Sequence, residues 1–242
     1  MTEPIIGASP RSRARVAGVL YLITIAAGFF AFSARSGMIV SGDAAATARH
    51  ILASEPLYRS SIAADLIGTA SYVGVTTLLY GLLRPVSRGV SLLAAFFSLV
   101  GCAIGAAITL NLVTALVFLE GAPYLAAFRP DQLQALARVF LRLHGQGYNI
   151  SLVFFGFYCA LLGYLVFRST FMPRFLGVLL AVAGLGWLAD SLATILWPAL
   201  ADHLDTFAMM SGGLGEGGLC LWLLAVGVNA PKWEQRAVAA RP

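Results

Sequence analysis

The sequence predicts an all-α, polytopic membrane protein built as a bundle of six transmembrane helices. Six mostly apolar segments of about 19 to 30 residues are separated by short polar breaks, and a helix needs about 20 residues to cross a bilayer. Hydrophobic residues make up 59% and charged residues 11% of the 242-residue chain, whereas about a quarter of an ordinary soluble domain is charged. The apolarity is continuous along each segment, which favours helices over the alternating strands of a membrane barrel.

The chain is expected to form a single six-helix transmembrane domain over residues 1–242, with short cytoplasmic tails at 1–15 and 230–242. The helices are expected at residues 16–34, 61–83, 90–119, 148–167, 173–196 and 210–228. Three arginines precede the first segment, as they would in a cleaved secretory signal. A retained helix is favoured, because the apolar part exceeds the core of a typical signal, about 7 to 15 residues, and another span follows. Pro173 suits the first turn of its helix, where its missing amide has no partner to lose.

Two connections between spans predict short amphipathic helices of their own. A Gly-Asp start signal opens the segment 43–52. Pro130 and Asp131 open the segment 132–143, in which apolar residues recur at helical spacing and arginines occupy the other face. Helices of this kind lie along the membrane interface or cap a bundle. Both are expected on the extracytoplasmic side.

Basic residues are distributed unequally between the two sides of the predicted bundle. Ten of the 16 lie on the side of the tails and of the tight turns 84–89 and 168–172, and six lie on the opposite side, where acids balance them. Under the positive-inside rule the richer side is cytoplasmic. Both termini are therefore expected in the cytoplasm, as an even number of spans also requires.

Composition excludes several classes of function. The net charge of +5 arises from singly scattered bases, whereas a nucleic-acid surface clusters basic and aromatic residues on one soluble face. The scattered pattern suits orientation at an anionic membrane surface. Cys102, Cys159 and Cys220 lie in three different apolar segments and are interpreted as small buried side chains. No cofactor is expected, and no metal site, because no histidine pair has ligand spacing.

Five short motifs carry a resemblance to a known family. They are Gly-Asp-Ala-Ala-Ala-Thr-Ala at 42–48, His-Gly-x-Gly at 144–147, Phe-Phe-Gly-x-x-Cys-x-x-x-Gly-Tyr-Leu at 154–165, Ser-x-Phe-x-Pro-x-x-Leu-Gly-x-Leu-Leu at 169–180 and Leu-Trp-Leu-Leu-x-x-Gly-Val-Asn at 221–229. Together they resemble the bacterial domain-of-unknown-function family 4386, a family of multi-span membrane proteins. The resemblance covers nearly the whole chain. It implies a helical fold in the bacterial plasma membrane, but no activity and no site residues.

Three ionisable residues, Asp65, Asp190 and Glu216, fall inside the predicted spans. Each costs about 2.5 to 3.5 kcal/mol at the bilayer centre on insertion scales, so each needs a structural or functional reason. The predicted orientation places all three in the extracytoplasmic third of the bundle. Glycines throughout 212–218 surround Glu216 and permit either close helix packing or the local unwinding with which transporters bind ions.

One polar stripe runs the length of the predicted helix 61–83. Its members recur every three or four residues: Ser61, Asp65, Thr69, Tyr72, Thr76 and Tyr80. Because lipid offers hydroxyl groups no partners, the stripe is expected to face the bundle interior. Two interpretations stay open: the stripe lines a polar cavity, or its hydroxyls bond to their own helix and its neighbours as packing contacts. His144, beside two glycines at the mouth of the span 148–167, is the histidine best placed to join such a cavity.

Three functions are compatible with these patterns. The favoured one is a small structural, sensory or partner-binding membrane protein whose buried polar groups specify helix packing. The second is a transporter or small-molecule-binding protein with an outer-facing polar cavity, and the third is a membrane-embedded enzyme acting on a lipid through one carboxylate, without an assigned catalytic residue. The expected partners are the lipid bilayer and a small-molecule or lipid ligand, with no nucleic acid and no predicted oligomeric state. The candidate ligand-binding residues are Asp65, Thr69, Tyr72, His144, Asp190 and Glu216.

Overall fold

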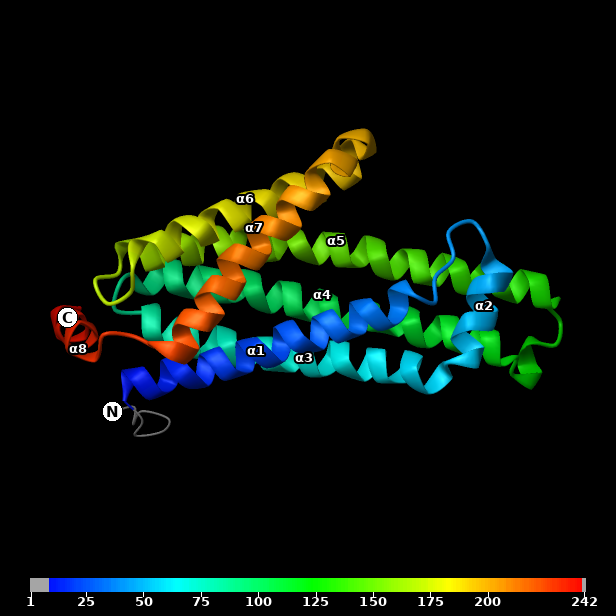
Figure 1. Ribbon diagram of the computed structural model, residues 1–242, viewed down its shortest axis with the longest axis horizontal. Coiled ribbons are helices and arrows are strands. Elements are labelled where there is room, and N and C mark those ends of the chain that lie inside the picture. The colour runs from blue at the N-terminus through cyan, green and yellow to red at the C-terminus, as the bar shows by residue number, and fades with distance from the viewer. Residues whose placement is uncertain (1–8, 241–242) are drawn as a thin grey trace. The chain divides into compact units, whose positions relative to one another are not determined.

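The computed structural model describes residues 9–240, which form helices joined by short loops and contain no strand (Figure 1). The parts of the predicted tails at 1–8 and 241–242 lie outside the described residues. The elements are α1 (Pro10–Ser36), α2 (Ala44–Ala53), α3 (Glu55–Leu83), α4 (Arg88–Glu120), η1 (Pro123–Leu125), α5 (Pro130–Arg168), α6 (Arg174–Leu196), α7 (Pro198–Ala225) and α8 (Ala230–Ala239). Six of them, α1 and α3 to α7, are long and apolar enough to cross a membrane. The predicted all-α, polytopic fold is confirmed.

Large apolar side chains cover the outward surfaces of the spanning helices. Phe29 of α1 is 73% exposed, Leu110 of α4 67% and Leu221 of α7 65%. In water, each Å² of such surface left uncovered forgoes about 25 cal/mol of stabilisation. In hydrocarbon the same side chains meet a solvent of their own polarity. The exposed surface is therefore that of a membrane-embedded protein.

Helix α5 joins two segments that the sequence pattern separates. The amphipathic stretch 132–143 and the span 148–167 belong to one continuous helix. Gly145 and Gly147 do not interrupt it, because a glycine costs a helix only about 1 kcal/mol relative to alanine. Gly147 also packs against α4, where a Cβ atom would collide with the side chain of Ile108. Close packing thus offsets the weak helix propensity of this stretch.

Helix α7 begins at Pro198, well before the predicted start at residue 210. Proline is tolerated in a first helical turn, and the helix continues through the polar turn containing Asp202 and Asp205, whose charges favour a loop in the sequence. Glu216 therefore lies deep within α7 and not near its first turns. The glycine-rich stretch 212–218 is helical throughout, so the structure has close packing there and no unwinding.

The described residues divide into two compact units. Unit 1 comprises the described residues up to Leu22, Ser71–Gly101 and those from Leu152 onward, and unit 2 comprises Ile23–Ala70 and Cys102–Ser151. Helices α1, α3, α4 and α5 contribute residues to both units. Helix α2 belongs to unit 2 alone, whereas α6, α7 and α8 belong to unit 1.

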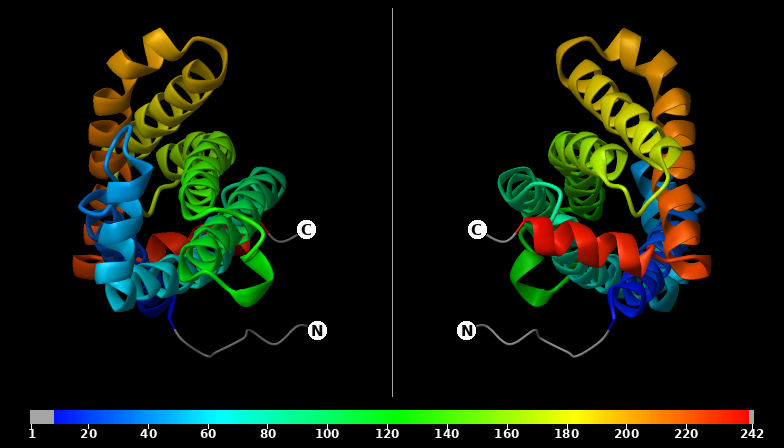
Figure 2. Two further views of the ribbon diagram at one scale, coloured as in Figure 1. Left: turned by 90° about the vertical axis from the view of Figure 1, so that its right-hand side faces the viewer. Right: turned by 90° about the vertical axis from the view of Figure 1, so that its left-hand side faces the viewer.

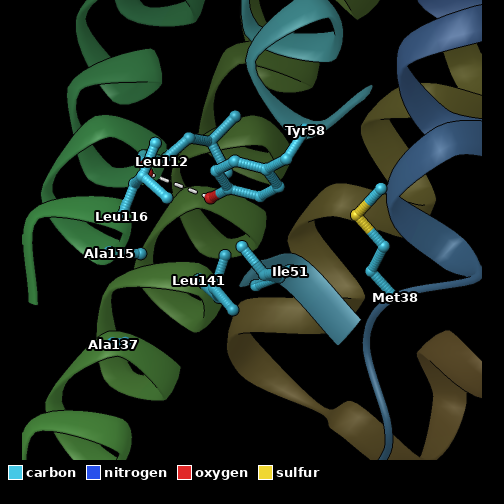
Figure 3. Packing of buried hydrophobic residues seen from close by; sticks show 8 residues of the cluster. All are labelled: Met38, Ile51, Tyr58, Leu112, Ala115, Leu116, Ala137 and Leu141. Atoms are coloured by element: carbon cyan, nitrogen blue, oxygen red, sulfur yellow. Dashed lines mark hydrogen bonds between the residues drawn. The ribbon is translucent and has the colours of Figure 1, made fainter. Parts of the chain in front are cut away.

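Unit 2 has an apolar core where α2 docks onto its neighbours. The buried members are Met38, Ile51, Tyr58, Leu112, Ala115, Leu116, Ala137 and Leu141 (Figure 3). Ile51 is 0% exposed and fixes α2 to this core. Asp43 caps α2, because its side chain accepts a hydrogen bond from the Ala46 amide at 2.8 Å. Tyr58 packs its ring in the core and donates its hydroxyl to the Leu112 carbonyl oxygen at 3.0 Å.

Unit 1 is assembled through close helix contacts at glycines. A Cβ atom on Gly163 of α5 would lie 2.7 Å from the carbonyl oxygen of Gly177 on α6, and one on Gly184 of α6 would lie 2.6 Å from the carbonyl oxygen of Gly156. Any larger side chain at these positions would separate α5 from α6. Helix α7 then returns antiparallel beside α6 (Figure 1). These contacts determine which polar side chains meet inside unit 1.

Candidate functional site

Glu216 lies on α7 where glycines bring that helix against α6. Gly212, one turn earlier, provides the space for the Trp187 indole ring, because a Cβ atom on Gly212 would collide with that ring. Residues four apart share a helix face, so the space at Gly212 directs the indole toward Glu216. The Trp187 Nε1–H donates a hydrogen bond to Glu216 Oε1 at 3.2 Å.

Two tyrosines from other helices reach the second carboxylate oxygen. Tyr21 of α1 donates its hydroxyl to Glu216 Oε2 at 2.6 Å, and Tyr72 of α3 donates to the same oxygen at 3.1 Å. The two side chains are 1% and 6% exposed, and their rings meet edge to face with centroids 5.4 Å apart. Both phenols are thus buried with their polar ends on one acceptor.

Helix α5 completes the surroundings of this carboxylate. Cys159 is 0% exposed, and its thiol interacts with Glu216. Phe155 and Tyr158 flank Tyr72, with ring centroids 5.1 and 5.9 Å from the Tyr72 ring. Side chains from α1, α3, α5 and α6 therefore converge on the acid of α7. We call Glu216, Tyr21, Tyr72, Trp187 and Cys159 the Glu216 site.

The hydrogen-bond donors of the Glu216 site are electrically neutral. Two phenols and an indole serve the two carboxylate oxygens, and within residues 9–240 no basic side chain forms an ion pair with Glu216. Hydrogen bonds to an ionised acceptor are roughly twice as strong as neutral ones, so the donors offset much of the cost of burying the carboxylate. None of these donors carries a positive charge that would balance a carboxylate.

Close helix approaches place the two tyrosines. Gly18, three residues before Tyr21, lies against α7, where a Cβ atom would be 2.8 Å from the Leu224 backbone nitrogen. Gly74 of α3 lies against α1, where a Cβ atom would be 2.7 Å from the Leu20 side chain. A larger residue at Gly18 would move α1 away from α7 and withdraw the Tyr21 hydroxyl from the site, whereas at Gly74 the Leu20 side chain would have to move.

Asp65 has a different environment, within unit 2. Arg35 of α1 forms an ion pair with it, with Nη1 2.7 Å from Oδ2 and Nη2 3.3 Å from Oδ1. The same guanidinium donates to the hydroxyl and the carbonyl oxygen of Ser61 at 3.2 and 3.3 Å. The Arg35 and Asp65 side chains are 13% and 21% exposed. The charge of Asp65 is thus balanced by a base on a neighbouring helix.

The other predicted ligand residues have different neighbours. Thr69 donates to the carbonyl oxygen one turn back in its own helix at 2.8 Å, as the packing interpretation of the polar stripe expects. His144 Nδ1 lies 3.2 Å from the carbonyl oxygen of Ile108 on α4. Asp190, 6% exposed on α6, has Asp205 of α7 as its interacting charged neighbour.

Among the six predicted ligand residues, Tyr72 and Glu216 are brought into direct contact within unit 1. The hydrogen bonds of residues 9–240 include none between Asp190 and Glu216. Across the same residues, no group of three or more His, Cys, Asp or Glu side chains is arranged to hold a metal ion.

The sequence pattern does not identify Tyr21, Trp187 or Arg35 as members of polar clusters. Tyr21 and Trp187 are single aromatic residues in apolar segments, where simple burial explains them. Arg35 ends an apolar segment, as an anchoring base does. Asp65 offers one signal in the sequence. It lies near the start of the next predicted span, on the same side of the bundle as Arg35, so Arg35 could neutralise it.

The chain is similar to a protein family and to an individual protein. A family model described as a domain of unknown function, DUF4386, matches residues 16–227, which include both polar clusters. A protein of Archaeoglobus fulgidus described as uncharacterized is 32% identical over 155 residues, covering 64% of this chain and 76% of that protein. No solved structure matches the chain significantly.

Proposed function

Since the chain belongs to the DUF4386 family, whose description names no activity, we propose a function from geometry: a membrane-embedded binding protein of the transporter class, in which Glu216 binds a small cationic ligand. The Glu216 site supplies the acid, and unit 1 supplies the helices that bring its donors together. The proposal assigns the Glu216 site a functional role and Asp65 a structural one.

One observation carries this proposal: Glu216 receives hydrogen bonds from three other helices and no balancing charge from residues 9–240. An acid within the membrane costs about 2.5 to 3.5 kcal/mol, whereas a neutral glutamine would serve a pure packing role at lower cost. The low dielectric of the interior strengthens the attraction of the carboxylate for a cation.

The donors also connect cation binding to helix movement. Tyr21, Tyr72 and Trp187 each tie α7 to a different helix of unit 1 through the same carboxylate. A cation bound to the Glu216 carboxylate competes with these hydrogen bonds. Cation binding therefore favours a different arrangement of α7 against its neighbours. Transporters need such a link between ligand binding and helix arrangement.

A structural role, the function that the sequence alone favours, fits Asp65 better. Its partner Arg35 already neutralises it, and Arg35 Nη1 also donates to the hydroxyl and the carbonyl oxygen of Ser61. A balanced, hydrogen-bonded pair of this kind fixes the packing of α1 against α3 within unit 2 and leaves no net charge for a ligand.

The test compares the purified wild-type protein with Glu216→Gln. Glutamine keeps the size and one oxygen acceptor of glutamate and removes its charge. Sodium, potassium and tetraphenylphosphonium chlorides are the probes, and melting temperature is the readout. At least one probe is expected to raise the melting temperature of the wild type, and none that of Glu216→Gln, which keeps its helical circular dichroism spectrum.

The matched control is Asp205→Asn, which removes an exposed acid from the same helix and is expected to keep the wild-type response. A wild type that no probe stabilises, or a Glu216→Gln protein that responds as the wild type does, would overturn the proposed function. A lower melting temperature for Glu216→Gln without any cation response in the wild type would assign the acid to packing.

We further propose that the protein resides in the bacterial plasma membrane with both termini in the cytoplasm. The excess of bases on the side of the tails supports this orientation. All three native cysteines are buried, so the wild type is a low background for thiol labelling. On intact cells an impermeant thiol reagent is expected to label Ala127→Cys and to spare Val86→Cys. The reverse pattern would invert the orientation.

A further inference from the structure

Helix α8 is attached to helix ends of unit 1 by two hydrogen bonds, one from a residue within α8 and one from the residue just before it. Trp233 Nε1 donates to the carbonyl oxygen of Leu82, in the last turn of α3, at 2.8 Å. The backbone N–H of Asn229, just before α8, donates to the carbonyl oxygen of Phe171, in the turn between α5 and α6, at 3.1 Å. As a result α8 lies across the ends of these helices instead of continuing away from them (Figure 2, right).

These attachments bring basic residues together at one end of unit 1. Arg84 follows Leu82 closely in sequence, and Arg168 and Arg174 flank Phe171. The start of α1 joins them, because Arg11 Nε donates to the carbonyl oxygen just after α7 at 3.3 Å. With the two bases of α8, the group is Arg11, Arg84, Arg168, Arg174, Lys232 and Arg236.

The charges of this group are available to a partner. In the described part of the chain none of the six forms an ion pair with an acid, and all are exposed except the half-buried Arg236. Glu234 is the single acid of α8. Guanidinium groups suit phosphate oxygens because their planar donors can bind two oxygens at once.

We propose that α8 and these basic helix ends form a binding site for the headgroups of anionic phospholipids. The ends of membrane-spanning helices lie at headgroup depth, and a helix lying across them with an anchored tryptophan has the placement of an interfacial helix. Each basic residue near a membrane surface strengthens attraction to anionic lipid by about fivefold. This site is separate from the Glu216 site, and neither proposal depends on the other.

The experiment titrates the purified full-length protein in detergent with phosphatidylglycerol or phosphatidylcholine and follows its melting temperature. Phosphatidylglycerol is expected to stabilise the wild type more than phosphatidylcholine does. In Lys232→Gln/Arg236→Gln, which keeps Trp233, the apparent Kd for phosphatidylglycerol is expected to weaken by about tenfold or more. Arg138→Gln/Arg142→Gln on α5 removes the same charge from unit 2 and is expected to bind as the wild type does.

Equal stabilisation by the two lipids, or unchanged phosphatidylglycerol binding by the α8 double variant, would overturn the proposal. Full competition by inorganic phosphate would assign the site to a soluble anion and overturn it as well. If the double variant does not fold, the exposed single change Lys232→Gln replaces it, with an expected weakening of about fivefold.

Discussion

The two polar clusters hold a membrane-buried acid in opposite ways. In unit 2, Asp65 is matched by the Arg35 guanidinium, and the pair is electrically balanced. In unit 1, Glu216 is held by the neutral donors of Tyr21, Tyr72 and Trp187, and within residues 9–240 no base forms an ion pair with it. An acid in a membrane helix therefore does not by itself indicate function. Under the proposed function, the charge of its partners distinguishes a structural acid from one that can bind a ligand.

Breaking the balanced pair should have the largest effect on stability. Asp65→Asn leaves the Arg35 guanidinium buried without its counter-charge, and the expected loss in unfolding free energy is about 3 to 5 kcal/mol. Reversible unfolding in mixed micelles measures this loss. The double variant Arg35→Gln/Asp65→Asn removes both charges and should recover most of it. If Asp65→Asn costs no more than Glu216→Gln, the contrast between the two clusters fails.

Adjacent glycines provide a sharper probe of the Glu216 site. Gly212→Ala should lower the free energy of unfolding by about 1 to 3 kcal/mol, because the new Cβ atom would collide with the Trp187 ring and force that ring away from Glu216. Gly213 has nothing within 4 Å of an added Cβ atom, so Gly213→Ala should gain up to about 1 kcal/mol from helix propensity. Reversible unfolding in mixed micelles measures both changes. Equal effects at the two positions would contradict the described packing of Trp187.

Removing the charge of Glu216 should lower the free energy of unfolding by less than breaking the Arg35–Asp65 ion pair does. Glu216→Gln converts charge-assisted hydrogen bonds to neutral ones and also relieves the cost of a buried charge, so the expected net loss is about 1 to 2 kcal/mol. The same unfolding measurement applies. A loss as large as that of Asp65→Asn would point to a cationic partner of Glu216 and would remove the basis for ligand binding.

The smallest effects should come from the individual donors. Tyr72→Phe keeps the ring and removes one hydrogen bond to Glu216, for an expected loss of about 1 kcal/mol. Tyr21→Phe should cost slightly more, since its hydroxyl is closer to the carboxylate, at 2.6 Å against 3.1 Å. Melting temperatures in one detergent rank the two. In the Glu216→Gln background both differences should shrink, and undiminished differences would show that the hydroxyls act elsewhere.

Sequence alone predicted the parts of this molecule that depend on local composition. Continuous apolarity identified the spanning helices, and a Gly-Asp start signal identified α2. The motifs at 42–48 and 154–165 and three others identified the family, which is confirmed by the match to residues 16–227. Tyr72 and Glu216 were both selected as candidates because each is costly in lipid.

The pairing of side chains across helices could not be predicted in the same way. Nothing in the residues around Tyr21 or Trp187 distinguishes them from ordinary buried aromatics. Their contact with Glu216 depends on how closely Gly18 and Gly212 let the helices approach. The continuity of α5 and the early start of α7 likewise depend on tertiary packing that outweighs weak helix propensity.

Direct binding is the measurement closest to the central claim that Glu216 is an uncancelled charge available to a cation. Equilibrium dialysis of the probe that stabilises the wild type should find one bound cation per chain in the wild type and in Arg35→Gln/Asp65→Asn, and none in Glu216→Gln. Undiminished binding by Glu216→Gln, or binding lost only with the Arg35–Asp65 pair, would contradict the account.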